Sequence, residues 1–160
     1  MNDETAALLF DAVGRLEVTI LARECPAIVV LQSERLLVLS DYDYLRDDET
    51  AAAFETRAAA KAREIDAVRW VLAVPQVWVI TPDAILSRAV SNHPLREGEQ
   101  EAITWMSFDR QDGVDYGRVP YTRRPNGEPV FGEPEMVTVG VRPDESMPGF
   151  KLLEESASAN

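Results

Sequence analysis

The stretch from Arg69 to Ile80 constrains the fold of this chain most, because it is apolar on both faces of a strand. Bulky residues fill both alternating series: Trp70, Leu72 and Val74 in one, Val71 and Ala73 in the other. β-Branched and aromatic residues on both faces predict one long, well-buried strand of a sheet. Pro75 lacks a backbone donor, so we expect a bulge or a break there. The alternative is that a preceding helix continues to Val74.

The segment before this strand begins with a helix and a hairpin. Asn2 or Asp3 can cap the helix, and its apolar stripe recurs at helical spacing as Leu9, Val13, Leu16 and Ile20. Pro26 ends this helix. Two short runs rich in Val, Leu and Ile follow at Ala27–Leu31 and Leu36–Ser40, and they predict a β-hairpin.

An acidic connection then leads into a second helix. Asp47 or Asp48 can cap this helix, and residues 50–66 are rich in alanine and other good helix formers. Beyond the long strand, Thr81-Pro82-Asp83 places a cap, a proline and an acid in the order that begins a helix. We therefore expect two helical turns over Ala84–Val90.

The remainder predicts antiparallel strands. A second hairpin joins Glu101–Asp109 to Val114–Tyr121, and short strands follow before residue 141. We expect an α+β fold in a single domain over residues 1–153, with a flexible C-terminal tail over residues 154–160. The sheet is expected to be mixed or antiparallel, of about five to seven strands, with the two main helices packed on one face.

Charge and cysteine content exclude several classes of function. The chain has 16 Lys+Arg against 28 Asp+Glu, a net charge of −12, and each half carries 14 acids and 8 bases. It lacks the basic patch that binds a phosphate backbone or an anionic membrane, so we expect no direct contact with nucleic acid or membrane. With 1 Cys and 1 His, an internal disulfide and a Cys-cluster or multi-His metal site are excluded. We expect no cofactor.

The start of the chain and its acidity bear on its location and partners. Met1–Thr5 is polar and acidic, unlike the start of a signal peptide, and no apolar run reaches membrane-spanning length. We therefore expect a cytoplasmic protein with a reduced Cys25. The acidity has two interpretations. It keeps the protein soluble, or it imitates nucleic acid and occupies a basic cleft of a partner protein.

The loop Ser91–Arg96 is the most chemically varied stretch of the chain. His93, the only imidazole, can exchange protons near neutral pH, and Arg96 can bind an anion with its planar guanidinium. In an extended segment Ser91 and His93 face the same side, as a Ser–His catalytic pair requires. Asn92 adds an amide for a ligand. The alternative is turn chemistry, in which His93 hydrogen-bonds to nearby backbone.

Two sets of alternating carboxylates are candidates for chemistry. The first set, Asp41 and Asp43, matches the D-x-D pattern that holds a hard divalent cation. The alternative to a cation site, which we favour, is a solvated connection that ends by capping a helix. Glu97, Glu99 and Glu101 alternate where a loop enters a strand, and acid–base work would need burial to separate their pKa values. We expect instead an exposed edge strand that is protected by charge.

Aromatic and basic side chains offer two further binding surfaces. All 3 Trp residues lie in predicted strands. Trp78 shares strand parity with Trp70, so both face one side and can form an aromatic patch for a ligand or partner, unless Pro75 shifts the register. Filling the core is the commoner role of such residues. Arg123-Arg124 beside Tyr121 can hold a phosphate or stack on a base, and a solvated turn is the alternative.

The order of features over residues 65–115 resembles small uncharacterised bacterial and phage proteins. These carry a Trp-bearing strand, here Val77-Trp78-Val79, and a loop of S-x-x-P-x-R-x-E type, matched here from Ser91 through Arg96. A strand that enters a hairpin follows, here Ile103–Phe108. The resemblance implies a small α+β domain of phage or mobile-element origin, and it assigns no catalytic residues.

Familiar catalytic motifs are absent from the sequence, which has no G-x-G-x-x-G, G-x-x-x-x-G-K-[ST], H-E-x-x-H or G-x-S-x-G. We therefore expect a small acidic interaction protein without enzymatic activity. Its partner would be a basic or nucleic-acid-binding protein, engaged through nucleic-acid mimicry or inhibition. The alternative is a small enzyme or ligand-binding domain that uses the Ser91–Arg96 loop with Asp41 and Asp43. Homo-oligomers, formed through strand edges or the Trp face, are also compatible with the sequence.

Overall fold

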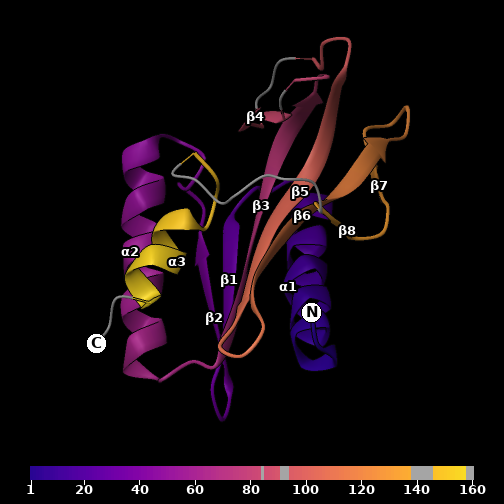
Figure 1. Cartoon of the computed structure of the whole chain (residues 1–160). Coiled ribbons are helices and arrows are strands. Elements are labelled where there is room, and N and C mark those ends of the chain that lie inside the picture. The colour runs from indigo at the N-terminus through magenta and orange to yellow at the C-terminus, as the bar shows by residue number, and fades with distance from the viewer. Residues whose placement is uncertain (84, 91–93, 138–145, 158–160) are drawn as a thin grey trace.

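A computed structural model describes the chain except for residues 84, 91–93, 138–145 and 158–160, and it has an antiparallel sheet between helices (Figure 1). The helices are α1 (Asp3–Leu21), α2 (Asp48–Glu64) and α3 (Phe150–Ala157). The strands are β1 (Ala27–Gln32), β2 (Leu36–Asp41), β3 (Arg69–Ile80), β4 (Ile85–Ala89), β5 (Glu99–Asp109), β6 (Gly113–Arg123), β7 (Pro129–Phe131) and β8 (Glu135–Met136). The α+β class is confirmed.

The sheet is built around β3, its longest described strand. The 8 strands follow the order β2-β1-β3-β5-β6-β7, with β4 beside β3 and β8 beside β6, and every described pair is antiparallel. β3 pairs with β1 and then β4 along one edge, and with β5 along the other. The long strand predicted at Arg69–Ile80 is therefore confirmed, and the helical alternative is wrong.

Pro75 lies in this strand without a bulge. The pairing of β3 with β5 runs unbroken through Pro75, which lies opposite Ile103. On the other edge, pairing with β1 ends at Ala73 and pairing with β4 begins at Gln76. Among the described strands, Pro75 thus lies where one edge of β3 has no neighbouring strand. On that edge, the backbone N–H that proline lacks would have had no strand to bond to, so no hydrogen bond of the sheet is lost there. The predicted bulge or break is wrong.

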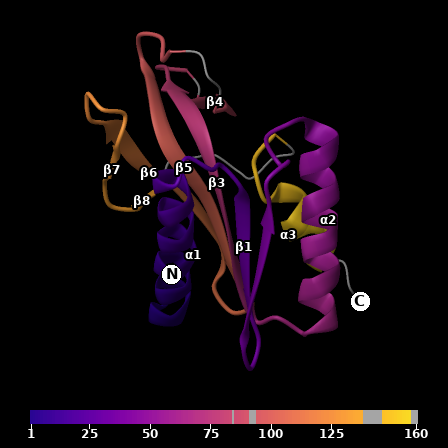
Figure 2. The ribbon, with the colours of Figure 1, turned by 180° about the vertical axis from the view of Figure 1, so that it is seen from behind.

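Helices α1 and α2 pack on opposite faces of the sheet, so the prediction that both lie on one face is wrong (Figure 2). Alternate residues of β3 divide between the two cores. Val71 and Ala73 pack with α1, whereas Trp70, Leu72 and Val74 pack with α2 and α3. Because β3 is apolar on both faces, both faces need a cover.

Two predicted local structures differ from those observed. Ile85–Ala89 forms β4 rather than a helix, because β3 extends past β1 and its free edge pairs with this segment as a hairpin. These ladder hydrogen bonds outweigh the helix-start signal at Thr81. Helix α3 runs to Ala157, into the segment predicted to be a flexible tail. Leu152 anchors it, since this side chain is fully buried against α2 and the sheet.

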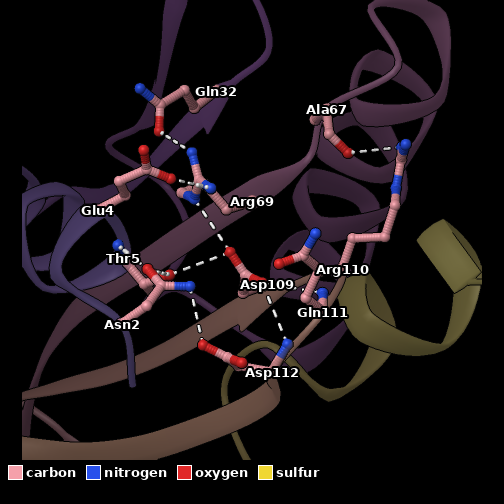
Figure 3. A network of polar contacts seen from close by, with 10 residues as sticks. All are labelled: Asn2, Glu4, Thr5, Gln32, Ala67, Arg69, Asp109, Arg110, Gln111 and Asp112. Atoms are coloured by element: carbon pink, nitrogen blue, oxygen red, sulfur yellow. Dashed lines mark hydrogen bonds and ion pairs between the residues drawn. The ribbon is translucent and has the colours of Figure 1, made fainter.

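A polar network fixes the start of α1 to the sheet (Figure 3). The carboxylate of Asp109, a residue that is 3% exposed, accepts hydrogen bonds from the Thr5 hydroxyl at 3.2 Å and from Nε of Arg69 at 3.0 Å. It also accepts from the backbone N–H groups of Gln111 and Asp112. Burial alone would raise the pKa of Asp109, but these N–H groups and Arg69 hold it below its ordinary value. The ionised carboxylate therefore joins α1, β3 and the β5–β6 hairpin.

Candidate functional site

A groove of about 610 Å³ lies where the start of α2, the start of α3 and strand β4 meet. Its acidic side chains are Asp47, Asp48, Glu55 and Glu154, and its apolar ones include Tyr44, Leu45, Met147, Pro148 and Phe150. We call these residues the acidic groove. The two helix starts are distant in sequence, and they converge because α3 packs against α2 (Figure 1).

Glu55 is the buried acid of the acidic groove, 5% exposed. It accepts a hydrogen bond from the Tyr44 hydroxyl at 2.6 Å and another from the backbone N–H of Leu152 at 3.1 Å. Burial, with Glu55 nearby, raises the pKa of Tyr44, so this hydroxyl stays protonated and donates. Glu55 therefore ties α3 and the connection before α2 to α2 itself, and both of its oxygens are used.

Asp47 also has a structural role. Its side chain caps α2, because Oδ1 accepts the backbone N–H of Thr50 at 2.7 Å. That hydrogen bond lowers the pKa of Asp47, so the cap is ionised at neutral pH. The capping role predicted for Asp47 or Asp48 is confirmed for Asp47.

The remaining acids of the groove are unpaired. Within the described part of the chain, the exposed carboxylates of Asp48 and Glu154 make no hydrogen bond and no ion pair. The same holds for Asp43 and Glu49, on either side of the Asp47 cap. The groove thus presents free negative charge from the start of α2 and from within α3.

The two cations of the groove already have acidic partners. Nζ of Lys151 lies 3.7 Å from Glu155, and Nε of Arg88 lies 2.7 Å from Glu99. Because these pairs reduce the positive charge that the groove offers, its free carboxylates dominate its electrostatics. The apolar side chains between them supply a surface for hydrocarbon. Together these features favour a cationic, partly apolar ligand.

Asp41 and Asp43, the predicted cation ligands, lie at the end of β2. Oδ1 of Asp41 accepts the backbone N–H of Asp43 at 2.7 Å, and Oδ2 lies 3.1 Å from Arg57. Both oxygens of Asp41 are therefore used within the chain, as in a turn. In the described residues, no group of three or more His, Cys, Asp or Glu is arranged to hold a metal ion. These contacts favour the alternative interpretation of a solvated connection.

The structure describes only part of the predicted Ser91–Arg96 site. Three of its residues lie outside the described part of the chain: Ser91, Asn92 and His93. Arg96 is exposed, and its backbone N–H donates to Oε1 of Glu99 at 2.6 Å. The catalytic pair and the Asn92 contact therefore stay predictions.

The described end of this loop borders a second pocket, of about 630 Å³, on the α1 face of the sheet. We call it the arginine–glutamate pocket, and its lining includes Arg23, Cys25, Arg88, Pro94, Leu95, Glu99, Glu101, Tyr121 and Arg123. Arg88 binds Glu99 through two hydrogen bonds of 2.7 and 3.0 Å. Arg123 binds Glu101 in the same way, at 2.8 and 3.2 Å.

The ladder between β5 and β6 begins at Ala102, so Glu99 and Glu101 precede it, but the predicted exposure of this edge is wrong for both. Glu97 is exposed, but Glu101 is 7% exposed, and so is the side chain of Glu99. Hydrogen bonds from Arg88 and then from the Arg96 N–H lower the pKa of Glu99 to about 2. Glu99 is thus ionised near neutral pH, and its fork with Arg88 occupies both of its oxygens. Sequence reasoning missed these partners because β4 and β6 supply them.

Two polar groups of the arginine–glutamate pocket are neutral. The hydroxyl of Tyr121 is buried and has no hydrogen-bond partner among the described residues, and burial raises its pKa. Burial also raises the pKa of the Cys25 thiol, which disfavours the nucleophilic thiolate. Arg123, which we predicted to hold a phosphate beside Tyr121, is instead bound to Glu101.

All three tryptophans are buried, so the predicted aromatic surface patch is wrong and the core role is confirmed. Trp70 and Trp78 face the same side, as the unbroken register requires, and Trp105 faces the other. Nε1 of Trp78 donates to the Thr104 hydroxyl at 2.7 Å, which donates to Gln76 at 2.7 Å. Trp78 lines a pocket of about 100 Å³, together with Gln76, Thr104 and Trp105.

Comparisons with protein-family models, curated proteins and solved structures find no significant match. The resemblance to small bacterial and phage proteins over residues 65–115 therefore stays a prediction. In the described chain, no helix combines the length and the apolarity that crossing a membrane requires.

Proposed function

We propose that this protein binds a basic segment of a partner protein in the acidic groove. The observation that carries the proposal is the pair of free carboxylates, Asp48 at the start of α2 and Glu154 within α3, which flank one groove. Leu45 and Phe150 add apolar surface beside them. Lys and Arg side chains consist of an apolar stem and a cationic end, so a groove of this composition fits them.

The charge of the whole chain supports a basic partner. A net charge of −12 attracts a cationic segment and accelerates its association at low ionic strength. The opposite face is less suited, because helix α1 exposes Phe10, Val18 and Leu21 there instead of a continuous row of acids. We therefore favour a basic segment in the groove over a broad face that imitates nucleic acid.

Fluorescence anisotropy with a labelled peptide of alternating Arg and Leu tests this function at about 0.05 M and about 0.3 M NaCl. We expect binding that weakens at the higher salt concentration, since exposed charges are screened. The double variant Asp48→Asn/Glu154→Gln should raise the Kd about tenfold, because it removes two exposed ionic contacts.

A charge-matched variant distinguishes the groove from general attraction. Glu34→Gln/Glu128→Gln removes two exposed charges from loops away from the groove, so it should change the Kd much less. Equal weakening by both double variants would mean that the peptide responds only to net charge, and the proposal would then fail. Absence of binding at low salt would reject it directly.

A second candidate function, binding of a small organic anion in the arginine–glutamate pocket, is favoured by the unpartnered hydroxyl of Tyr121. Pro94 and Leu95, two described residues of the predicted loop, line this pocket and supply apolar surface. Arg23 makes no ion pair with the described residues, which leaves one positive charge in excess there. A thermal shift with medium-chain carboxylates that Arg23→Ala abolishes would support this function. The absence of a shift at about 10 mM ligand would reject it.

A further inference from the structure

The outer face of α1 carries an apolar stripe that no described part of the chain covers. Phe10, Val18 and Leu21 are 57%, 65% and 51% exposed. Ala7 is also exposed, and Gly14 lies between them. These five residues recur three or four positions apart, so they lie along one face of the helix. We call them the α1 stripe.

This stripe is distinct from the face of α1 that packs on the sheet. Leu9, Val13 and Leu16 fill that inner face, and none is more than 4% exposed. A helix that packs on one side only is normally polar on the other side. Contiguous apolar side chains on an outer face mark a surface that another molecule covers, because their burial is favourable.

We propose that the α1 stripe is the contact surface of a homodimer, in which two α1 helices pack antiparallel about a twofold axis at Gly14. The stripe is complementary to itself in this arrangement. Phe10 lies level with the partner's Val18, and Ala7 lies level with the partner's Leu21. At the centre, a Cβ on Gly14 would meet nothing within 4 Å, so the two backbones have room to approach closely.

The charges beside the stripe favour the antiparallel arrangement of a second copy. Asp11 and Arg15 flank the stripe on one side and form an ion pair of 2.8 Å within the helix. In the antiparallel pair, Arg15 of one protomer and Asp11 of the other differ in height along the helix axis by only about 3 Å. Arg15 can therefore form an ion pair with the partner's Asp11 as well as with its own. A parallel pair would instead place Arg15 level with the partner's Arg15.

The dimer and the acidic groove use opposite faces of the sheet (Figure 2). Binding of a basic segment and dimerisation are therefore independent, and each can fail without the other.

Sedimentation velocity from about 1 µM to about 500 µM protein tests the dimer. The wild type should shift from monomer to dimer, and Val18→Glu and Phe10→Glu should each raise the dissociation constant at least about tenfold. Ala60→Glu, which adds the same charge at an exposed site of α2, should leave it unchanged. Thermal melts show whether each variant is folded. A wild type that stays monomeric, with the stripe left for solvent or another partner, would overturn the proposal. So would a dimer that survives both stripe variants.

Cysteine cross-linking tests the arrangement. In a Cys25→Ser background, Gly14→Cys should form a disulfide-linked dimer under mild oxidation, because the two sites meet at the axis. Ala7→Cys should not, since antiparallel helices separate these sites by about 21 Å along the axis. Cross-linking of Ala7→Cys, or its absence in Gly14→Cys while the protein is dimeric in solution, would contradict the proposed packing.

Discussion

At the residue scale, buried carboxylates with partners from distant segments organise this protein. Glu55, Glu101 and Asp109 are 5%, 7% and 3% exposed. Each accepts hydrogen bonds from another element: Glu55 from Leu152 of α3, Glu101 from Arg123 of β6, and Asp109 from Arg69 of β3. A buried charge is tolerated only when it is paired and hydrogen-bonded. Removing one of these acids should therefore cost more stability than removing an exposed one.

Glu55 provides the clearest test of this expectation. Glu55→Ala should lower the free energy of unfolding by about 3 kcal/mol, because the Tyr44 hydroxyl and the Leu152 N–H lose a charged acceptor in a buried site. Urea denaturation monitored by circular dichroism measures the change. Glu49→Ala, at an exposed site of the same helix, should change it by less than about 0.5 kcal/mol. Similar losses in the two variants would contradict the bridging role of Glu55.

The ion pair of Glu99 predicts a dependence of stability on pH. Its pKa is about 2 in the folded protein, against an ordinary value of 4.5. A carboxyl whose folded pKa is depressed stabilises the fold above its unfolded pKa, and this contribution disappears as the pH falls through the folded pKa. The contribution of Glu99 should therefore be intact above about pH 4.5 and lost between about pH 4.5 and about pH 2. Urea midpoints over this range should fall more steeply for the wild type than for Glu99→Gln, and parallel curves would refute the pairing.

At the scale of elements, close approach between strands decides which glycines are required. A Cβ on Gly117 of β6 would overlap the carbonyl oxygen of Glu135 in β8 and crowd the ring of Trp105. Strand β8 can pair with β6 at this position only because Gly117 has no side chain. Gly14 is the opposite case, since the space around it is open and it lies within a helix.

The same substitution at these two glycines should therefore have opposite effects. Gly117→Ala should lower the free energy of unfolding by about 1–3 kcal/mol, because β8 must move away from β6. Gly14→Ala should raise it by about 0.5–1 kcal/mol, because alanine is the better helix former. Urea denaturation at low micromolar concentration keeps a dimer from contributing to either value. Hydrogen exchange at the Val137 N–H, which bonds to Tyr116, should accelerate only in Gly117→Ala.

At the scale of the whole molecule, the excess of acids acts on both stability and binding. With 28 Asp+Glu against 16 Lys+Arg, the folded chain repels itself and attracts cations. Raising NaCl from about 0.02 M to about 0.5 M should therefore raise the urea midpoint while weakening the binding of the Arg–Leu peptide. A midpoint that falls with salt would mean that local ion pairs, such as Arg69 with Asp109, outweigh the net repulsion.

Local signals predicted most of the helices and strands. Asn2 and Asp47 cap the two long helices as expected, because a cap acts on backbone N–H groups only a few residues away. The alternation of apolar residues predicted β3 on the same local grounds. The acidic connection before α2 was also evident, but its role as one wall of a groove was not. That role depends on α3, for which the sequence predicted no helix and whose second half lies in the predicted tail.

Features that join distant segments were decided only by the tertiary structure. The sequence determined that β3 is apolar on both faces, yet only the packing shows that α1 covers one face and α2 the other. The sequence also determined that Glu99 and Glu101 lie on one side of a strand. The arginines that allow their burial belong to β4 and β6, and only the fold positions them beside these acids. Periodicity and capping act over a few residues along the backbone. Burial and charge pairing depend on which distant segments meet, and the physical reason is that buried groups must find their partners wherever the fold supplies them.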